Sequence, residues 1–214
     1  MKLKKTYYTV ALTIGLTSFS PAATLIGRGI RNGSFEADVG KQTNWTGVSD
    51  WEFWSTAVGG PGTVDNDSGT DGPSAGGSLV DGSRISFIQP NSAAFNMTST
   101  VLSVGDVINF SWVWTLPGRG EATTTLVYQD GANVVAFGTA SASSGGAATL
   151  YNGTTLTVQA GDAWVGKTVG LGVSTTGSYP EVDDFQLDVT PSPEPSSSAL
   201  LGLGGLALIL RRRK

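Results

Sequence analysis

The side chains that could do chemistry in this chain are carboxylates, hydroxyls, amides and aromatic rings, because its 214 residues include no His and no Cys. Without His, the Ser-His-Asp and Cys-His arrangements of hydrolases cannot form. The usual zinc ligands are missing as well, and no disulfide can form. The residue types therefore favour binding over catalysis.

The carboxylates of the chain give no sign of a catalytic pair. A glycosidase needs two carboxylates across a cleft, one of them with a raised pKa. The four glutamates of the central segment, Glu36, Glu52, Glu121 and Glu181, are scattered along the sequence, and no motif pairs them. We predict that the protein is not an enzyme, and a glycoside-acting enzyme is the least favoured alternative.

The charge of the central segment is strongly negative. Residues 24–190 hold six basic and 16 acidic residues, a net charge of 6 − 16 = −10. This charge repels nucleic acids, which we exclude as partners, and it favours cations. Calcium, which takes six to eight oxygen ligands, is the cofactor that such a composition favours.

A short aromatic segment suggests a sugar-binding surface. Alternate residues of a strand lie on the same face, so Trp51 and Phe53 would share one face and Glu52 and Trp54 the other. One of these two sets faces outward if the segment is a strand. A sugar ring can lie on an exposed indole, and we take Trp51 and Trp54 as candidate ligand-binding residues. The alternative that these rings fill the core or an edge stays open.

Residues 1–22 have the pattern of a secretory signal peptide. Lys2, Lys4 and Lys5 precede a mostly apolar run, and small residues end it at Ser20-Pro21-Ala22. We expect the export machinery and signal peptidase to act on this segment. An uncleaved membrane anchor is the alternative.

The C-terminal end has three parts in order. Residues 191–195 contain Pro193, Glu194 and Pro195, residues 196–210 are three serines followed by an apolar run, and residues 211–214 are Arg211, Arg212, Arg213 and Lys214. The twelve residues without charge at 199–210 would cover about 18 Å as a helix, so extension back through the serines gives a marginal transmembrane helix. The basic tail is expected to stay in the cytoplasm.

This three-part end resembles the PEP-CTERM sorting signal. The resemblance implies recognition by an exosortase, export across the inner membrane with transient anchoring, and then a place at the cell surface or in the extracellular matrix. It also implies association with exopolysaccharide.

Residues 23–190 read as an all-β domain. About ten short strand-like runs are separated by Gly-, Pro- and Ser-rich turns, and no run has a helical period. The predicted strands are Asn32–Glu36, Trp51–Thr56, Arg84–Gln89, Ala94–Thr100, Val107–Leu116, Thr123–Gln129, Asn133–Thr139, Thr149–Gln159, Thr168–Ser174 and Val182–Val189. We expect an antiparallel, jelly-roll-like β-sandwich.

Alternation along two of these strands predicts which side chains form the core. In Val107–Leu116, the residues Ile108, Phe110, Trp112 and Trp114 share one face, as expected of an antiparallel sheet with one buried face. In the last strand, Asp183 has the same parity as Phe185, and is expected on the core face.

Several short motifs resemble those of galactose-binding-like jelly rolls. They are Asn32-Gly33-Ser34-Phe35-Glu36, Asp81-Gly82-Ser83-Arg84-Ile85-Ser86-Phe87, Leu102–Phe110, Trp164–Val169 and Val182–Leu187. Many members are carbohydrate-binding modules with a structural calcium between the first and last strands. The resemblance implies that Glu36 and Asp183 would hold this calcium.

Together these observations predict an exported, surface-sorted and non-catalytic protein that binds carbohydrate or belongs to an exopolysaccharide matrix. The alternative from another class is a purely structural matrix protein without a specific ligand.

Overall fold

A computed structural model describes residues 21–37, 47–53, 69–71, 82–115, 120–143, 148–175 and 180–192. All of them belong to one unit, Pro21–Ser192. Residues 1–20 and 193–214 lie outside the described residues, and with them almost all of the predicted signal peptide and the whole predicted transmembrane helix. Within the described ranges, no helix is long and apolar enough to span a membrane.

The described secondary structure consists of strands. In chain order they are β1 (Ala23–Ile26), β2 (Glu52–Phe53), β3 (Gly69–Asp71), β4 (Ile85–Phe87), β5 (Ala93–Val101), β6 (Val107–Trp114), β7 (Thr123–Asp130), β8 (Asn133–Ala142), β9 (Thr149–Asn152), β10 (Leu156–Thr157), β11 (Thr168–Ser174) and β12 (Glu181–Thr190).

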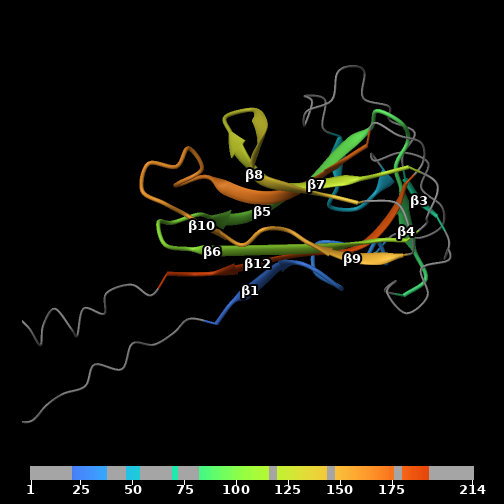
Figure 1. The fold of residues 1–214 in the computed structure, drawn as a ribbon, viewed down its shortest axis with the longest axis horizontal. Helices are drawn as coiled ribbons and strands as arrows, with labels where there is room; N and C mark the ends of the chain where they lie inside the picture. Colours follow the sequence, from blue (N-terminus) through green and yellow to red (C-terminus); the bar gives the residue numbers. More distant parts are fainter. Residues whose placement is uncertain are drawn as a thin grey trace, which may run out of the picture. The chain divides into compact units, whose positions relative to one another are not determined.

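The strands form two antiparallel sheets that pack face to face (Figure 1). One sheet has the order β10-β6-β12-β4-β3, with β1 added beside β12 and β9 added beside β6. The other has the order β2-β5-β11-β7-β8. The predicted class, an all-β antiparallel sandwich of jelly-roll type, is confirmed.

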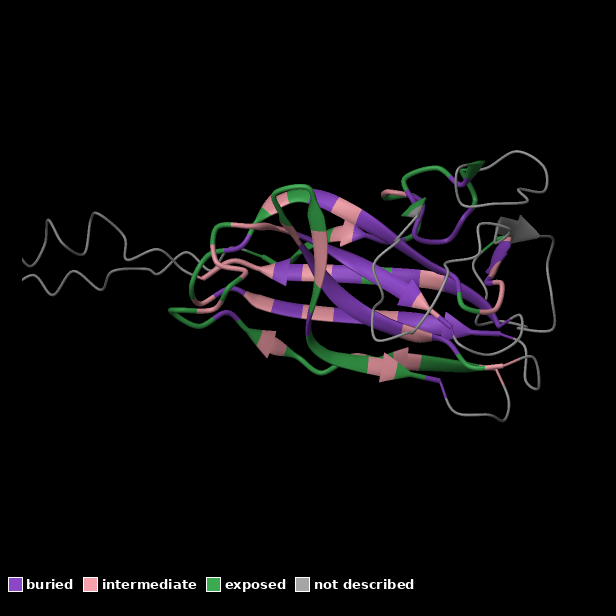
Figure 2. Cartoon of the chain, turned by 90° about the horizontal axis from the view of Figure 1, so that it is seen from above, coloured by how far each residue is buried: buried purple, intermediate pink, exposed green. Residues whose placement is uncertain are grey.

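The core lies between the two sheets and follows the alternation of the sequence (Figure 2). The four alternating residues of β6, Ile108, Phe110, Trp112 and Trp114, are all buried in it, as predicted. From β11 come Val169, Leu171 and Val173, and from β12 come Val182, Phe185, Leu187 and Val189. Each such fully buried side chain stabilises the fold by about 1.5–3 kcal/mol relative to exposure, before chain entropy is counted.

A β-bulge interrupts β12 and changes which residues face the core. Val182 pairs with Trp114 and Asp183 with Val113, but Gln186 pairs with Ser111. Two residues of β12, Asp184 and Phe185, therefore lie opposite the single Trp112, and Asp184 takes the left-handed conformation with a φ of 47°. Such a bulge shifts the alternation by one residue.

The loop after β1 fills a gap along one side of β12. β4 pairs with the first residues of β12 and β1 with the last ones, both on the side away from β6. Between them the loop 27–37 hydrogen-bonds to the β12 backbone: the amide of Phe185 donates to the carbonyl of Gly33 at 2.8 Å. A side chain on Gly33 has no room there, since its Cβ would lie 2.4 Å from the carbonyl oxygen of Phe185.

This loop is where the predicted first strand fails. Residues 32–36 form turns, because Arg31, Asn32 and Phe35 all have positive φ angles that a strand cannot contain. The predicted strand 149–159 is also interrupted, and forms the short strands β9 and β10 on either side of residues 153–155.

Candidate ligand-binding surface

Glu36, a predicted calcium ligand, holds the loop 27–37 against the start of β4. Its carboxylate accepts hydrogen bonds from the amide of Ser83 at 2.8 Å, the hydroxyl of Ser83 at 3.3 Å and the amide of Arg84 at 2.5 Å. Gly82 leaves room for this carboxylate, because a Cβ at position 82 would lie 2.4 Å from the Cδ of Glu36. The contacts that the structure gives to Glu36 are therefore those of a structural anchor.

Asp183, the second predicted calcium ligand, lies on the other face of its sheet from the one expected. It pairs with Val113, and directly opposed residues of an antiparallel ladder share a face. The neighbours Trp112 and Trp114 point into the core, so Asp183 lies on the outer face, although it is 0 % exposed. The prediction that Asp183 shares the core face with Phe185, two residues away, was wrong because the bulge inserts one extra residue between them.

Both predicted calcium ligands lie beside β4. Glu36 bonds to the residues just before it, and Asp183 follows Val182, which pairs with Ser86 of β4. Within the described part of the chain, no group of three or more acidic, His or Cys side chains is arranged to hold a metal ion. The calcium site stays a prediction.

Trp51, a predicted ligand-binding residue, belongs to the core. Its indole is 3 % exposed and packs against the rings of Phe35 and Phe185, at centroid distances of 5.5 Å and 5.0 Å. Its Nε1 donates to the carbonyl of Asn32 at 3.2 Å. A buried indole offers no ring face to a sugar, which corrects the ligand-binding role expected of Trp51. Trp54 lies outside the described residues.

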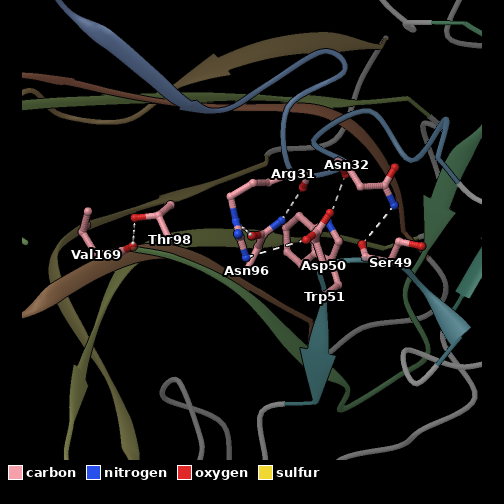
Figure 3. Close-up of polar contacts among 8 residues, drawn as sticks. All are labelled: Arg31, Asn32, Ser49, Asp50, Trp51, Asn96, Thr98 and Val169. Carbon is pink, nitrogen blue, oxygen red and sulfur yellow. Dashed lines mark hydrogen bonds and ion pairs between the residues drawn. The ribbon is translucent and has the colours of Figure 1, made fainter. Parts of the chain in front are cut away.

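A cluster of polar side chains lies beside Trp51 (Figure 3). Asn96 of β5 is fully buried, donates to the carbonyl of Arg31 at 2.6 Å and accepts from the Nε of Arg31 at 3.1 Å. The guanidinium of Arg31 then lies 3.8 Å from the carboxylate of Asp50. These two charged side chains are 38 % and 39 % exposed, so the pair is presented to solvent.

The backbone of this cluster is held in strained conformations. Arg31, Asn32 and Asp50 have φ angles of 47°, 49° and 64°, in the left-handed region that non-glycine residues seldom adopt. Asn32 stabilises the arrangement by donating to the carbonyl of Ser49 at 3.0 Å and accepting from the amide of Ala37 at 3.0 Å. Strain of this kind persists only where the surroundings fix it, and it often accompanies binding sites.

A second guanidinium lies on the same loop. Arg28 makes a bidentate ion pair with Asp184 of the β12 bulge, with distances of 2.9 Å and 2.7 Å. Both oxygens of Asp184 are engaged by this pair. By contrast, Arg31 and Asp50 are joined by a single longer contact and retain donor and acceptor capacity for a ligand.

We define the Arg31–Asp50 surface as these two side chains together with their support, Asn32 and Asn96. It presents a planar donor fork and a carboxylate acceptor side by side, which suits the paired hydroxyls of a sugar. Sequence reasoning missed it, because the two residues are 19 positions apart and neither belongs to a motif. Residues that a loop brings together leave no periodic pattern in the sequence.

The comparisons with known proteins concern the C-terminus and the body separately. A family model of the PEP-CTERM protein-sorting motif matches residues 193–214. No curated protein matches the chain.

Several solved structures resemble the body at low sequence identity. The CBM22-1 xylan-binding domain from Paenibacillus barcinonensis Xyn10C is 14 % identical, with 80 % of this chain and 97 % of that one covered and a TM-score of 0.47. The C-terminal family 22 carbohydrate-binding module of Clostridium thermocellum Xyn10B is 12 % identical, with 82 % and 95 % covered and a TM-score of 0.43. TmCBM61, solved with β-1,4-galactotriose, is 14 % identical, with 74 % and 95 % covered and a TM-score of 0.42.

The chain is thus an antiparallel β-sandwich protein that carries a PEP-CTERM sorting motif. The prediction that Pro193, Glu194 and Pro195 form a sorting signal is confirmed. The motif indicates export and membrane-associated sorting to the cell surface.

Proposed function

We propose that the protein is an exported, surface-sorted and non-catalytic module that binds extracellular polysaccharide. The sorting motif supports the location, with exosortase, signal peptidase and the export machinery as the partners that process the chain. The Arg31–Asp50 surface supports the binding role, because its two half-exposed charged groups lie 3.8 Å apart and are supported by the buried side chains of Asn32 and Asn96. This pair is the single observation that carries the proposal.

Trp54 is a second candidate for sugar binding, separate from the Arg31–Asp50 surface and argued from the sequence pattern. Trp51 points into the core and Glu52 is exposed, so alternation along the strand predicts the outward side for Trp54. An outward indole would give a sugar ring an apolar face to lie on, and Arg31 and Asp50 would bind sugar hydroxyls at their own surface. Calcium at Glu36 and Asp183 remains part of the proposal as a stabilising ion, and contributes no step to binding.

The test is the mobility of the full chain in affinity gels that contain soluble polysaccharides. Asp50→Asn keeps the size of the side chain and suits its positive φ, but removes the carboxylate; Trp54→Ala removes the indole. The matched control is Asp130→Asn, because Asp130 is also a part-exposed aspartate, paired with Lys167 at 3.0 Å.

The proposal predicts that a polysaccharide which slows the wild-type chain slows Asp130→Asn equally, and slows Asp50→Asn and Trp54→Ala at least about tenfold less. Loss of one charged hydrogen-bonding partner accounts for this factor. Equal retardation of all four proteins would reject the Arg31–Asp50 surface as the binding site.

A further inference from the structure

A buried carboxylate holds the last residue of the body. Asp106, just before β6, is 5 % exposed and uses both of its carboxylate oxygens. Oδ2 accepts from the amide of Ser103 at 2.8 Å, which closes the turn between β5 and β6, and Oδ1 accepts from the amide of Ser192 at 3.0 Å. Ser192 directly precedes the sorting motif, which begins at Pro193. The body is therefore anchored as far as the start of the motif.

This anchor continues the pairing of β12 with β6. The ladder between the two strands ends where Thr190 pairs with Val107. Two residues further along the chain, the side chain of Asp106 holds Ser192 in place of a ladder partner. Gly105 packs against the same residue, because a Cβ at position 105 would lie 2.5 Å from the Oγ of Ser192. A hydrogen bond and close packing thus fix Ser192 together.

Both ends of the described body lie on this side of the sandwich. Ala23, the first residue of β1, pairs with Val189 near the end of β12. Figure 1 shows the start of β1, the end of β12 and the turn between β5 and β6 on the same side. We call residues 101–106 together with Ser192 the exit surface. The segments predicted as signal peptide and membrane helix continue the chain from the two ends beside it.

The exit surface exposes apolar side chains. Of the described residues, four large hydrophobic side chains are exposed, and two of them, Val101 and Val104, lie in this turn at 52 % and 50 %. Charge beside the turn is paired: the carbonyl of Lys167 accepts from the amide of Leu102 at 2.9 Å, and its Nζ lies 3.0 Å from Asp130. One exposed valine is ordinary, but two beside the anchored end of the body offer an apolar contact to a molecule that approaches there.

The length of chain beyond Ser192 indicates which molecule this is. The three residues of the motif, 193–195, span at most about 11 Å when fully extended. The uncharged run begins only at Ala199, whose distance from Ser192 can reach about 25 Å. Even a domain of 100 residues has a radius of gyration of about 13 Å, so an enzyme that binds the motif must approach the exit surface closely. Chain length therefore favours this enzyme over the bilayer as the partner.

We propose that the exit surface contacts the exosortase while the enzyme holds the sorting motif. Asp106 is a positioning residue in this contact, because it keeps the start of the motif beside Val101 and Val104. The inference rests on the processing by an exosortase that is proposed above, and it is independent of polysaccharide binding, which involves other residues.

A spacer between Ser192 and Pro193 tests the contact in the full chain, because it leaves the body and the motif unchanged. Twelve Gly and Ser residues reach about 40 Å, so the enzyme can hold the motif without touching the body. A flexible tether then supplies an effective concentration of only about millimolar. In cells that carry the enzyme, the spacer should slow processing about tenfold, the effect of losing one or two apolar contacts, as measured by the decrease in mass of pulse-labelled chains. An unchanged rate would overturn the proposal, and so would a faster one, because the body would then obstruct the enzyme.

A charge in the contact gives a second test. Val104→Asp should slow processing about tenfold in the natural chain but have little effect in the chain with the spacer. Leu150→Asp is the matched control, because Leu150 is also an exposed apolar residue, at 47 %, and pairs in β9 with Val113 near the other end of β6. Equal slowing by the two variants would contradict the proposal. Equal slowing by Val104→Asp with and without the spacer would contradict it as well.

Asp106→Ala tests the anchor. Its matched control is Asp162→Ala, because Oδ2 of Asp162 accepts from the amide of Gln159 at 2.7 Å and closes a turn in the same way. Loss of the bond to Ser192 should make Asp106→Ala about threefold slower in processing than Asp162→Ala. The spacer should abolish this difference, which a general loss of stability would leave in place. Slowing by Asp106→Ala that persists with the spacer would reject the positioning role.

A photoreactive amino acid at position 104 identifies the partner. The proposal predicts a covalent adduct with the exosortase, which is lost when residues 193–195 are changed to Ala. Adducts with lipid alone would overturn it. The same Ala variant separates the two proposals: if it is processed like the wild type, the sorting role fails. If it is not processed and the spacer changes nothing, only the contact at the exit surface is rejected.

Discussion

Replacement of Glu36 is the most informative single change, because the structure and the family resemblance assign this residue different roles. In the structure its carboxylate accepts three hydrogen bonds from Ser83 and Arg84 and so joins the loop 27–37 to β4. The resemblance makes it a calcium ligand. Glu36→Ala removes both roles, while Glu36→Gln removes only the charge.

The magnitude follows from the bonds lost. Hydrogen bonds to a charged group contribute about 1.5–3 kcal/mol each when buried, but the three bonds of Glu36 are exposed, so each is worth about 1 kcal/mol or less. Glu36→Ala should therefore lower the free energy of unfolding by about 2–3 kcal/mol. For a unit of this size that corresponds to about 5–10 °C in melting temperature.

Glu36→Gln should cost much less, about 1 kcal/mol. The amide oxygen of Gln can accept from the amides of Ser83 and Arg84, and its NH2 group can donate to the hydroxyl of Ser83. Gly82→Ala should act like Glu36→Ala, because the added Cβ displaces the same carboxylate. Their effects should be far from additive in the double variant, since both remove one contact.

The assay is thermal unfolding followed by circular dichroism, first with chelator and then with millimolar calcium. An unchanged melting temperature for Glu36→Ala in chelator would refute the anchoring role. If calcium raises the melting temperature of the wild type but not of Glu36→Gln, Glu36 is a ligand as well; if it raises neither, the calcium site is rejected.

Further changes test the core, the support of the binding surface and the sorting motif. Phe185→Ala removes a fully buried ring that contacts Phe35 and Trp51, and should lower the free energy of unfolding by about 3–5 kcal/mol in urea titrations. Asn96→Ala removes two hydrogen bonds to Arg31 and should cost about 1–3 kcal/mol, with weaker polysaccharide binding; full binding would contradict the support described for Arg31. Gly170→Ala places a Cβ 2.3 Å from the carbonyl oxygen of Asn96 and should cost about 1–3 kcal/mol by the same titration. Changing residues 193–195 to Ala should abolish surface retention in cell fractionation, and unchanged processing would reject the sorting role.

The long strands could be predicted from sequence because each buries one face more than the other. This difference leaves an alternation of apolar and polar residues along the strand. β5, β6, β7, β11 and β12 lie within two residues of the predicted bounds, apart from the predicted end of β6, which extends into residues outside the described ones. The β12 bulge could not be predicted, because it depends on Asp184 taking a positive φ opposite Trp112 in another strand. One inserted residue was enough to place Asp183 on the wrong face.

The candidate site was only partly predictable for a related reason. The aromatic segment was recognised, and Trp51 and Glu52 do differ in burial as the alternation predicted, but the sequence could not tell which of them is buried. Trp51 is the buried one because Phe35 and Phe185 meet it in the core, and Phe35 comes from a loop rather than from the predicted strand. Arg31 and Asp50 approach each other only through that same loop.

The most direct test of the account is binding of the folded full chain to a panel of soluble polysaccharides, with calcium and with chelator. The polysaccharide-binding role predicts saturable binding to at least one member, lost in Asp50→Asn and kept in Asp130→Asn. No binding to any member, by a chain with a cooperative unfolding transition, would contradict the polysaccharide-binding role and leave a structural protein of the cell surface.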